Sequence, residues 1–214
     1  MKTFIFDFDG TIVDNLNQVM DLLQKNLATR SIDLSQYPVS TLRNTGVREF
    51  MKQIKISKLE LLSIYKDIKK EIRLHLEESS PVKDLSSVLS QLSVDCQLFI
   101  FSSNNKQTIL SYLNKYDLSK NFADIFEDDS YFGKDVGLKK IVKSKKLDPQ
   151  NTFYFGDESR DIIASKNAGI KAVGVLWGFE GEIPLSAADP DYLLSTPSEL
   201  LKLANQPWPL STYY

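Results

Sequence analysis

Short apolar runs alternate with helical patterns along most of this chain. The runs are rich in aromatic and β-branched residues, and they lie at 3–8, 97–101, 152–155 and 172–176, with a weaker one at 192–194. Both faces of these runs are apolar, which is typical of strands buried in a parallel sheet. Amphipathic helical patterns separate them, at 82–92, 108–116, 136–146 and 161–168. Strand followed by helix, repeated, predicts an α/β fold with right-handed crossovers.

One stretch, from about residue 15 to residue 79, breaks this alternation because it has no convincing strand pattern. Its apolar residues recur at helical spacing, at Val19, Leu22, Leu23 and Leu27 and again at Leu59, Leu62, Ile68, Ile72 and Leu76. Residues spaced in this way line one face of a helix. A chain of 214 residues is short for two full-sized enzyme domains. We therefore expect an α/β core of residues 1–14 and 80–214, with a helical domain of residues 15–79 inserted into it.

The charge balance argues against several classes of partner. Lys and Arg number 26 against 28 Asp and Glu, so the net charge is −2. This balance gives no bulk electrostatic reason to bind nucleic acid or an anionic membrane. The first apolar run is interrupted by Asp7, which predicts neither a signal peptide nor a membrane span. We expect a cytoplasmic protein, a monomer or homodimer, with no nucleic-acid or membrane partner.

The chain has one cysteine, Cys96, and one histidine, His75. An intrachain disulfide and a zinc site of the usual Cys/His kind are therefore excluded. Hydrolases with a Ser-His or Cys-His pair are disfavoured too, since His75 would have to be the base. We expect Cys96 to be buried and His75 to lie on the surface. If the protein is an enzyme, its acid and base are expected to be carboxylates.

Two aspartates follow the first apolar run, in the order Phe6-Asp7-Phe8-Asp9-Gly10-Thr11. Ligands bind at the carboxyl ends of the strands in parallel α/β sheets, so Asp7 and Asp9 are expected at a binding edge. Alternation along an ideal strand would put both on one face, and Gly10 would let the backbone turn sharply beside them. Two neighbouring carboxylates are unfavourable unless a cation or paired donors offset their repulsion.

The run Asp7-Phe8-Asp9-Gly10-Thr11 resembles the first motif of the haloacid-dehalogenase superfamily of phosphatases. The second motif of that superfamily is a Ser or Thr at the end of an apolar strand, which Ser102 matches. The fourth is Gly-Asp after another strand, with an Asp four residues further on, and Gly156-Asp157 with Asp161 match it. Four motifs in this order are a much more specific signal than any one of them.

The third motif is a lone lysine upstream of the strand at 152–155. We assign it to Lys134, because this residue precedes the helical pattern of 136–146 and is expected in a loop that faces the site. Lys139 and Lys140 lie within the helical pattern and are competing candidates. Many relatives carry Lys-Pro at this place, and this chain has Lys134-Asp135 instead.

The resemblance implies a Rossmann-like parallel core with a helical cap inserted after the first motif. It also implies phosphoryl transfer through a covalent aspartyl-phosphate. Asp7 would attack phosphorus, and Asp9 would protonate the leaving group and then activate water. Mg²⁺ would be held by the Asp7 carboxylate, the backbone carbonyl of Asp9 and Asp157. Asp161 would orient water or Lys134 rather than bind the metal directly.

The resemblance assigns the phosphoryl oxygens to Ser102 and Lys134, assisted by backbone amides near Gly10, Thr11 and Ser103. The substrate would be a small phosphorylated metabolite, with phosphoglycolate-type compounds as a family-level expectation. A phosphosugar mutase, and a regulatory protein that carries or binds phosphate without turnover, are also open. In the insertion, Arg43 and Arg48 flank Asn44-Thr45-Gly46. These arginines either face the site and select the substrate or lie exposed on the surface.

Overall fold

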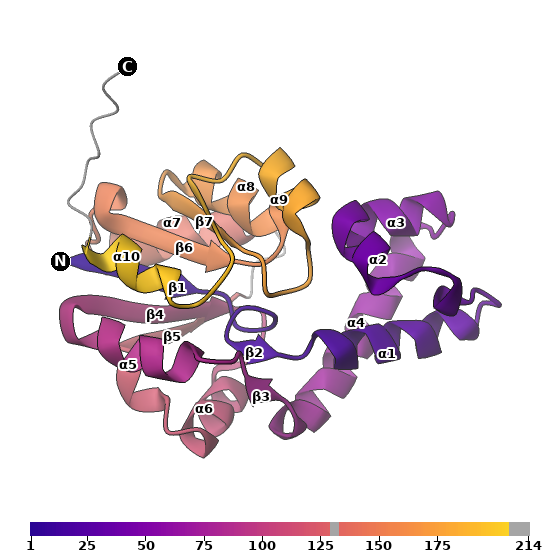
Figure 1. The fold of residues 1–214 in the computed structure, drawn as a ribbon, viewed down its shortest axis with the longest axis horizontal. Helices are drawn as coiled ribbons and strands as arrows, with labels where there is room; N and C mark the ends of the chain where they lie inside the picture. Colours follow the sequence, from indigo (N-terminus) through magenta and orange to yellow (C-terminus); the bar gives the residue numbers. More distant parts are fainter. Residues whose placement is uncertain (129–132, 206–214) are drawn as a thin grey trace.

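A six-stranded sheet forms the centre of the molecule, seen here in a computed structural model that describes residues 1–128 and 133–205 (Figure 1). Its strands are β1 (Lys2–Phe6), β4 (Cys96–Ser102), β5 (Asp124–Glu127), β6 (Thr152–Gly156), β7 (Lys171–Val175) and β8 (Tyr192–Leu194). They lie in the order β5-β4-β1-β6-β7-β8, and every neighbouring pair is parallel. The prediction of a parallel α/β fold is therefore confirmed.

Helices cover both faces of this sheet. They are α5 (Leu85–Asp95), α6 (Lys106–Lys115), α7 (Lys134–Ser144), α8 (Ser159–Ala168), α9 (Glu182–Ala187) and α10 (Glu199–Asn205). Apolar residues of α5, α6 and α10 share one core cluster, whereas those of α7 and of Ala164 in α8 belong to a second. Alternate residues of β1 divide between the two clusters, with Phe4 and Phe6 in the first and Ile5 in the second. All three are almost completely buried, which explains why the run is apolar on both faces.

A helical insertion lies beside the sheet, to its right in Figure 1. It consists of α1 (Leu16–Ala28), α2 (Val39–Thr45), α3 (Val47–Gln53) and α4 (Lys58–His75). The short strands β2 (Val13–Asp14) and β3 (Ser80–Pro81) pair antiparallel at the place where the chain leaves the core and returns. Buried residues of α4 at Ile64, Ile68 and Ile72 share the larger core cluster with Leu23 and Leu27 of α1. The proposed boundaries of a cap at 15–79 fall next to the β2–β3 pair and stay a prediction.

Several features were not predicted from the sequence. The strand β5 was missed, as were the small β2–β3 pair and the helices α9 and α10. Of the four residues of β5, Ile125 alone is buried, so this edge strand has no continuous apolar pattern. The first strand ends at Phe6, two residues earlier than expected, and Asp7 and Asp9 therefore lie in the loop that follows it.

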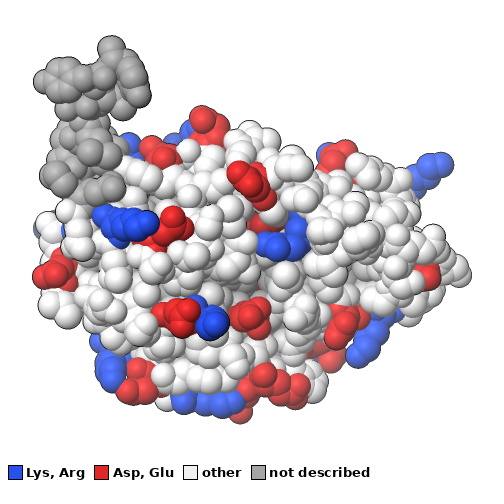
Figure 2. All heavy atoms as spheres, in the orientation of Figure 1, with Lys and Arg blue, Asp and Glu red and all other residues white. Residues whose placement is uncertain are grey.

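The single cysteine and the single histidine lie where the sequence predicts. Cys96 is buried, and the exposed His75 ring lies 2.8 Å through Nδ1 from Oε1 of Glu78. On the face drawn in Figure 2, acidic and basic side chains are interspersed. None of the helices in the described part of the chain is both long and apolar enough to cross a membrane.

Candidate active site

The carboxyl ends of the three central strands bring the predicted polar residues together. Asp7 follows β1, Ser102 ends β4 and Asp157 follows β6, and all three side chains are buried. The backbone N–H of Asp7 donates to the carbonyl of Phe155 over 2.8 Å, which extends the pairing of β1 with β6 by one residue. The binding edge expected for a parallel sheet is therefore where these side chains lie.

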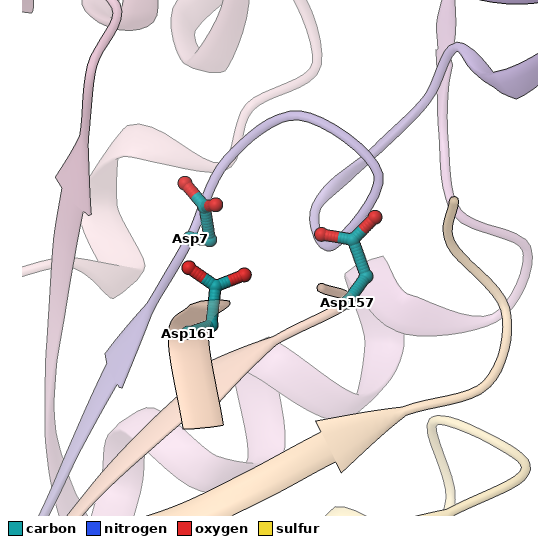
Figure 3. A group of neighbouring side chains, drawn as sticks. All are labelled: Asp7, Asp157 and Asp161. Atoms are coloured by element: carbon teal, nitrogen blue, oxygen red, sulfur yellow. The ribbon is translucent and has the colours of Figure 1, made fainter. Parts of the chain in front are cut away.

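A group of three buried carboxylates, Asp7, Asp157 and Asp161, lies at this edge (Figure 3). One oxygen from each lies within 4.8 Å of one from each of the others. Asp161 is in the first turn of α8, where its Oδ2 accepts from the backbone N–H of Glu158 over 3.2 Å. Buried carboxylates so close repel one another unless cations lie among them. An all-oxygen set of this kind fits a hard divalent cation such as Mg²⁺.

Lys134 lies among these carboxylates. Its Nζ donates to Asp7 Oδ2 over 2.5 Å, to Asp161 Oδ1 over 2.6 Å and to the Tyr154 hydroxyl over 3.0 Å. Of the three candidate lysines, Lys134 is the one at the site, because Lys139 pairs with Asp135 on the surface and Lys140 is exposed. The position expected for Lys134 needs one correction. It is the first residue of α7 rather than part of a preceding loop.

Burial and charge shift the ionisation of this cluster. Burial raises the pKa of Asp7 to about 6, and the nearby Lys134 ammonium opposes the shift. Burial, with repulsion from Glu158 and Asp161, raises the pKa of Asp157 well above its usual range. For Lys134, Asp161 and Asp7 outweigh the effect of burial and hold the pKa well above its ordinary value. Lys134 thus pairs with two of the three carboxylates, and a cation bound beside Asp7 and Asp157 would favour their ionised forms.

Asp157 is closely enclosed by backbone. Its Oδ2 accepts from the backbone N–H of Phe179 over 2.7 Å, and its Oδ1 from the Thr11 hydroxyl over 3.2 Å. A Cβ added at Gly178 would lie 2.3 Å from Asp157, so the loop after β7 requires glycine there. Thr11 was expected to lend its backbone amide to phosphate. That role of the amide stays a prediction, and the Thr11 side chain additionally helps to fix the Asp157 carboxylate.

Asp9 lies apart from the three grouped carboxylates and is held by two amides. Asn15 Nδ2 donates to its Oδ1 over 2.9 Å, and Asn104 Nδ2 donates to its Oδ2 over 2.8 Å. Phe8, between the two aspartates, is fully buried with its ring edge-on to Tyr112. The two asparagines were not singled out from the sequence as residues that contact the site.

The loop after β4 carries Ser102 and Ser103, both predicted to contact phosphate. Ser102 Oγ accepts from the backbone N–H of Asn104 over 3.1 Å. Ser103 turns toward α4, where its carbonyl accepts from Lys69 and, over 3.2 Å, from Arg73. The Tyr65 and Ser103 hydroxyls lie 3.4 Å apart.

The sequence of α4 carries a signal for this contact. Tyr65, Lys69 and Arg73 are spaced by four residues, so they share one face of α4. This polar stripe runs beside the buried stripe of Ile64, Ile68 and Ile72. The polar stripe is the part of α4 that contacts the loop after β4.

Arg43 joins the insertion to the loop after β7. Its guanidinium donates to the Leu176 carbonyl over 2.6 Å, and its own carbonyl accepts from the Gly181 N–H over 2.8 Å. Arg43 is thus neither fully exposed nor paired with the carboxylate group. The side chain of Arg48 lies outside the described part of the structure.

Arg160, in the first turn of α8, is a further charged residue near the site that the sequence did not single out. Its Nε lies 2.6 Å from Glu158 Oε2, and its guanidinium lies 5.8 Å from the centre of the Tyr65 ring. Glu158 pairs with this arginine, whose ring contact connects α8 with α4. Its charge also opposes the rise in the pKa of Asp7.

A buried carboxylate and lysine cluster at the carboxyl edge of a parallel sheet is typical of α/β enzymes. The family model described as haloacid dehalogenase-like hydrolase matches residues 4–175. The phosphoglycolate phosphatase of Synechococcus elongatus is 30% identical over 208 residues, which are 96% of this chain and 98% of that protein. The chain belongs to the haloacid dehalogenase-like hydrolase family. The predictions of this family and of a hydrolase are confirmed.

Further relatives differ in the substrate that their names imply. The pyrophosphatase PpaX of Bacillus velezensis is 26% identical over 216 residues, covering 95% of this chain and 96% of that protein. The structure of a haloacid dehalogenase-like hydrolase from Streptococcus pneumoniae superposes with a TM-score of 0.74 at 19% identity, over 95% of this chain and 98% of that one. At this level of identity the likeness supports the assignment of the fold.

Proposed function

We propose that the protein is a Mg²⁺-dependent phosphatase that hydrolyses a small phosphomonoester through an aspartyl-phosphate on Asp7. The observation that carries this proposal is the contact of Lys134 with both Asp7 and Asp161 beside Asp157, at the carboxyl edge of the sheet. A carboxylate nucleophile, a lysine and acidic groups that can hold Mg²⁺ suit phosphoryl transfer, in which positioning and electrostatic stabilisation supply most of the catalysis. Family membership supports the same chemistry.

Mg²⁺ would be held by the carboxylates of Asp7 and Asp157 and by the backbone carbonyl of Asp9. When bound, the ion would neutralise charge between the phosphoryl group and these carboxylates and polarise a phosphoryl oxygen. Asp161 would keep its contact with Lys134 and so fix the lysine beside the nucleophile.

Asp7 would act as the nucleophile. A carboxylate needs no base to activate it once it is ionised, and Lys134 favours the ionised form. Lys134 and the Ser102 hydroxyl would bind phosphoryl oxygens, with backbone N–H groups of Thr11 and Ser103 as further donors. These groups are already held in place by the fold, so they would stabilise the transferring phosphoryl group without reorganising.

Asp9 would carry the proton in both halves of the reaction. First, the bond between phosphorus and the leaving oxygen breaks as Asp7 binds phosphorus, and the leaving oxygen takes the proton of Asp9. Water then attacks phosphorus and loses a proton to Asp9, and the bond between Asp7 and phosphorus breaks. Phosphate and an alcohol are released, and both aspartates return to their starting forms.

The helices of residues 15–79 would serve as a cap that limits the size of the substrate. Tyr65, Lys69 and Arg73 of α4 and Arg43 of α2 contact loops on two sides of the site. Such enclosure suits a small phosphorylated metabolite, and the name of the Synechococcus relative favours a phosphoglycolate-type compound.

Inorganic pyrophosphate is a second candidate substrate, favoured by the name of the PpaX relative. A phosphosugar mutase and a regulatory protein without turnover have less support. Both oxygens of Asp9 are held by amides, which suits a residue that transfers a proton, and a regulatory protein without turnover does not need such a residue.

A phosphate-release assay with the substitution Asp7→Asn tests the proposal. The panel should contain 2-phosphoglycolate, pyrophosphate, a phosphorylated hexose and 4-nitrophenyl phosphate, each with Mg²⁺. We expect the wild type and Asp95→Asn, a change at an exposed aspartate of α5, to release phosphate. Asp7→Asn should release none. Full activity of Asp7→Asn would refute the nucleophile, and a hexose phosphate isomerised without phosphate release would indicate a mutase.

A further inference from the structure

A line of hydrogen bonds connects α4 of the insertion to Asp9. Arg73 Nε donates to Asn104 Oδ1 over 2.8 Å, and Asn104 Nδ2 donates to Asp9 Oδ2 over 2.8 Å. On the other side of the carboxylate, Asn15 Nδ2 donates to Asp9 Oδ1, while Asn15 Oδ1 accepts from the Gly10 N–H over 3.2 Å. Both asparagine side chains are buried, with Asn104 1% exposed and Asn15 2% exposed.

The partners of each asparagine allow it one orientation. A guanidinium and a backbone N–H are donors only, and a carboxylate is an acceptor only. If the Asn104 amide were flipped, its oxygen would face the Asp9 carboxylate and its NH₂ would face Arg73. Both contacts would then be repulsive. Arg73 therefore determines that Asn104 presents a donor to Asp9. In the same way, the Gly10 N–H determines that Asn15 presents a donor to Asp9.

We propose that Asn104, oriented by Arg73, is a positioning residue that holds the Asp9 carboxyl in line for proton transfer to the leaving group. This inference rests on the proposed function, because it assigns a partner to the proposed acid. The two residues act on the reaction through Asp9. Arg73 has a second contact, to the Ser103 carbonyl, and its effect on Asn104 must therefore be separated from simple anchoring of the loop.

Substrates whose leaving groups differ in basicity can distinguish an effect of Arg73 on Asn104 from simple anchoring of the loop. A departing alkoxide needs a proton, whereas 4-nitrophenolate leaves readily without one. A residue that positions the acid should thus affect kcat/KM for an alkyl phosphate far more than kcat/KM for 4-nitrophenyl phosphate. A residue that merely anchors the phosphate-binding loop should affect both substrates alike.

The experiment measures kcat/KM for 4-nitrophenyl phosphate and for the alkyl phosphomonoester that the wild type hydrolyses fastest. General acid catalysis contributes about 10²- to 10⁴-fold, so misplacing the acid in Asn104→Ala should lower the alkyl value by about 10- to 100-fold. The aryl value should fall by less than about 3-fold, since that step needs little of this assistance. Arg73→Met should show the same selectivity with a smaller loss, and Lys70→Met, at an exposed neighbour on α4, should match the wild type.

The double variant tests whether Arg73 acts through Asn104. Adding Arg73→Met to Asn104→Ala should produce no further selective loss, because residues in one network are not additive. Arg73 is exposed, so Arg73→Met tests the inference even if Asn104→Ala fails to fold. Equal losses on the two substrates, or additive selective losses, would overturn the inference and leave the proposed function intact. A wild type that hydrolyses neither substrate would overturn both.

Discussion

Gly10 lies directly against the carboxylate of Asp157. A Cβ added at Gly10 would lie 2.1 Å from Asp157 Oδ2, and Gly10 has φ of 71°, in the left-handed region that favours glycine. The turn that follows Asp7 and Asp9 is therefore in contact with the end of β6. This contact links the first and fourth motifs of the sequence physically.

The substitution Gly10→Ala should lower both stability and activity. The methyl group must displace Asp157 and also occupy a strained backbone conformation, which should lower the free energy of unfolding by about 1–3 kcal/mol. Gly169→Ala is the matched control, because Gly169 has φ of 75° with nothing within 4 Å of an added Cβ. Thermal melts and kcat should show a stability loss in both variants and a large loss of kcat in Gly10→Ala. Unchanged kcat in Gly10→Ala would contradict the packing against Asp157.

Asp157 should make the metal-free protein less stable as pH rises. Its pKa is higher in the folded chain than in the unfolded chain, chiefly because of burial, so the folded state binds the proton more tightly. Stability is thus greatest below the unfolded value of about 4, falls as pH rises from there toward the folded value, and reaches its minimum once the folded carboxyl has ionised. In a chelating buffer at pH 8, Asp157→Asn should unfold with a free energy about 1–2 kcal/mol higher than the wild type, as is common when a functional site is neutralised.

Denaturant melts in chelator at several pH values measure this difference, with Asp95→Asn as the surface control. The advantage of Asp157→Asn should shrink toward pH 4, because the folded wild-type carboxyl is then protonated and no longer repels its neighbours. A variant less stable than the wild type at pH 8 would show that the hydrogen bonds from Thr11 and Phe179 outweigh the repulsion.

Magnesium should stabilise the wild type and restore its activity after chelation. A ligand that binds the folded state at about 100 times its Kd adds about 2.7 kcal/mol to the free energy of unfolding. The free energy of unfolding of Asp157→Asn should rise much less with Mg²⁺, because one of the proposed metal ligands is lost. Calorimetry and phosphate release with and without Mg²⁺ test this. Equal activity in excess chelator would argue against a metal-dependent reaction.

Removing the charge of Lys134 should destabilise the protein more than removing the charge of Lys139. Lys134→Met would leave Asp7 and Asp161 buried without their cation, and breaking a buried pair costs about 3–5 kcal/mol. Lys139→Met removes an exposed pair with Asp135, and exposed pairs contribute at most about 1 kcal/mol. Melts and kcat for the two variants compare them directly. A larger loss of activity in Lys139→Met would reverse the choice between these lysines.

The sequence predicted the centre of the fold, and it placed the candidate residues at the edge of the sheet where the structure has them, for physical reasons. The apolar runs of the central strands are continuous, and Asp7, Ser102 and Asp157 follow them directly, so strand order alone brings these residues to one edge. The edge strand β5 lacked such a run, since most of its residues are partly exposed.

Contacts between the insertion and the core could not be derived in the same way. The pairing of Arg73 with Asn104, and of Arg43 with Leu176, depends on where the helices lie relative to the sheet. These contacts join residues that are 31 and 133 positions apart in the sequence, and no local pattern specifies such a pairing. The polar stripe on α4 indicates a surface that faces a partner but does not identify that partner.

Trapping the phosphorylated protein is the most direct test of the central claim, that Asp7 becomes phosphorylated during turnover. Asp9→Asn should still accept phosphate from 4-nitrophenyl phosphate with Mg²⁺, because this leaving group needs little protonation, but should hydrolyse the intermediate slowly. We predict that rapid acid quenching followed by peptide mass spectrometry finds one phosphoryl group on Asp7 of this variant. A phosphoryl group on another residue, or none while 4-nitrophenol is still released, would contradict the claim.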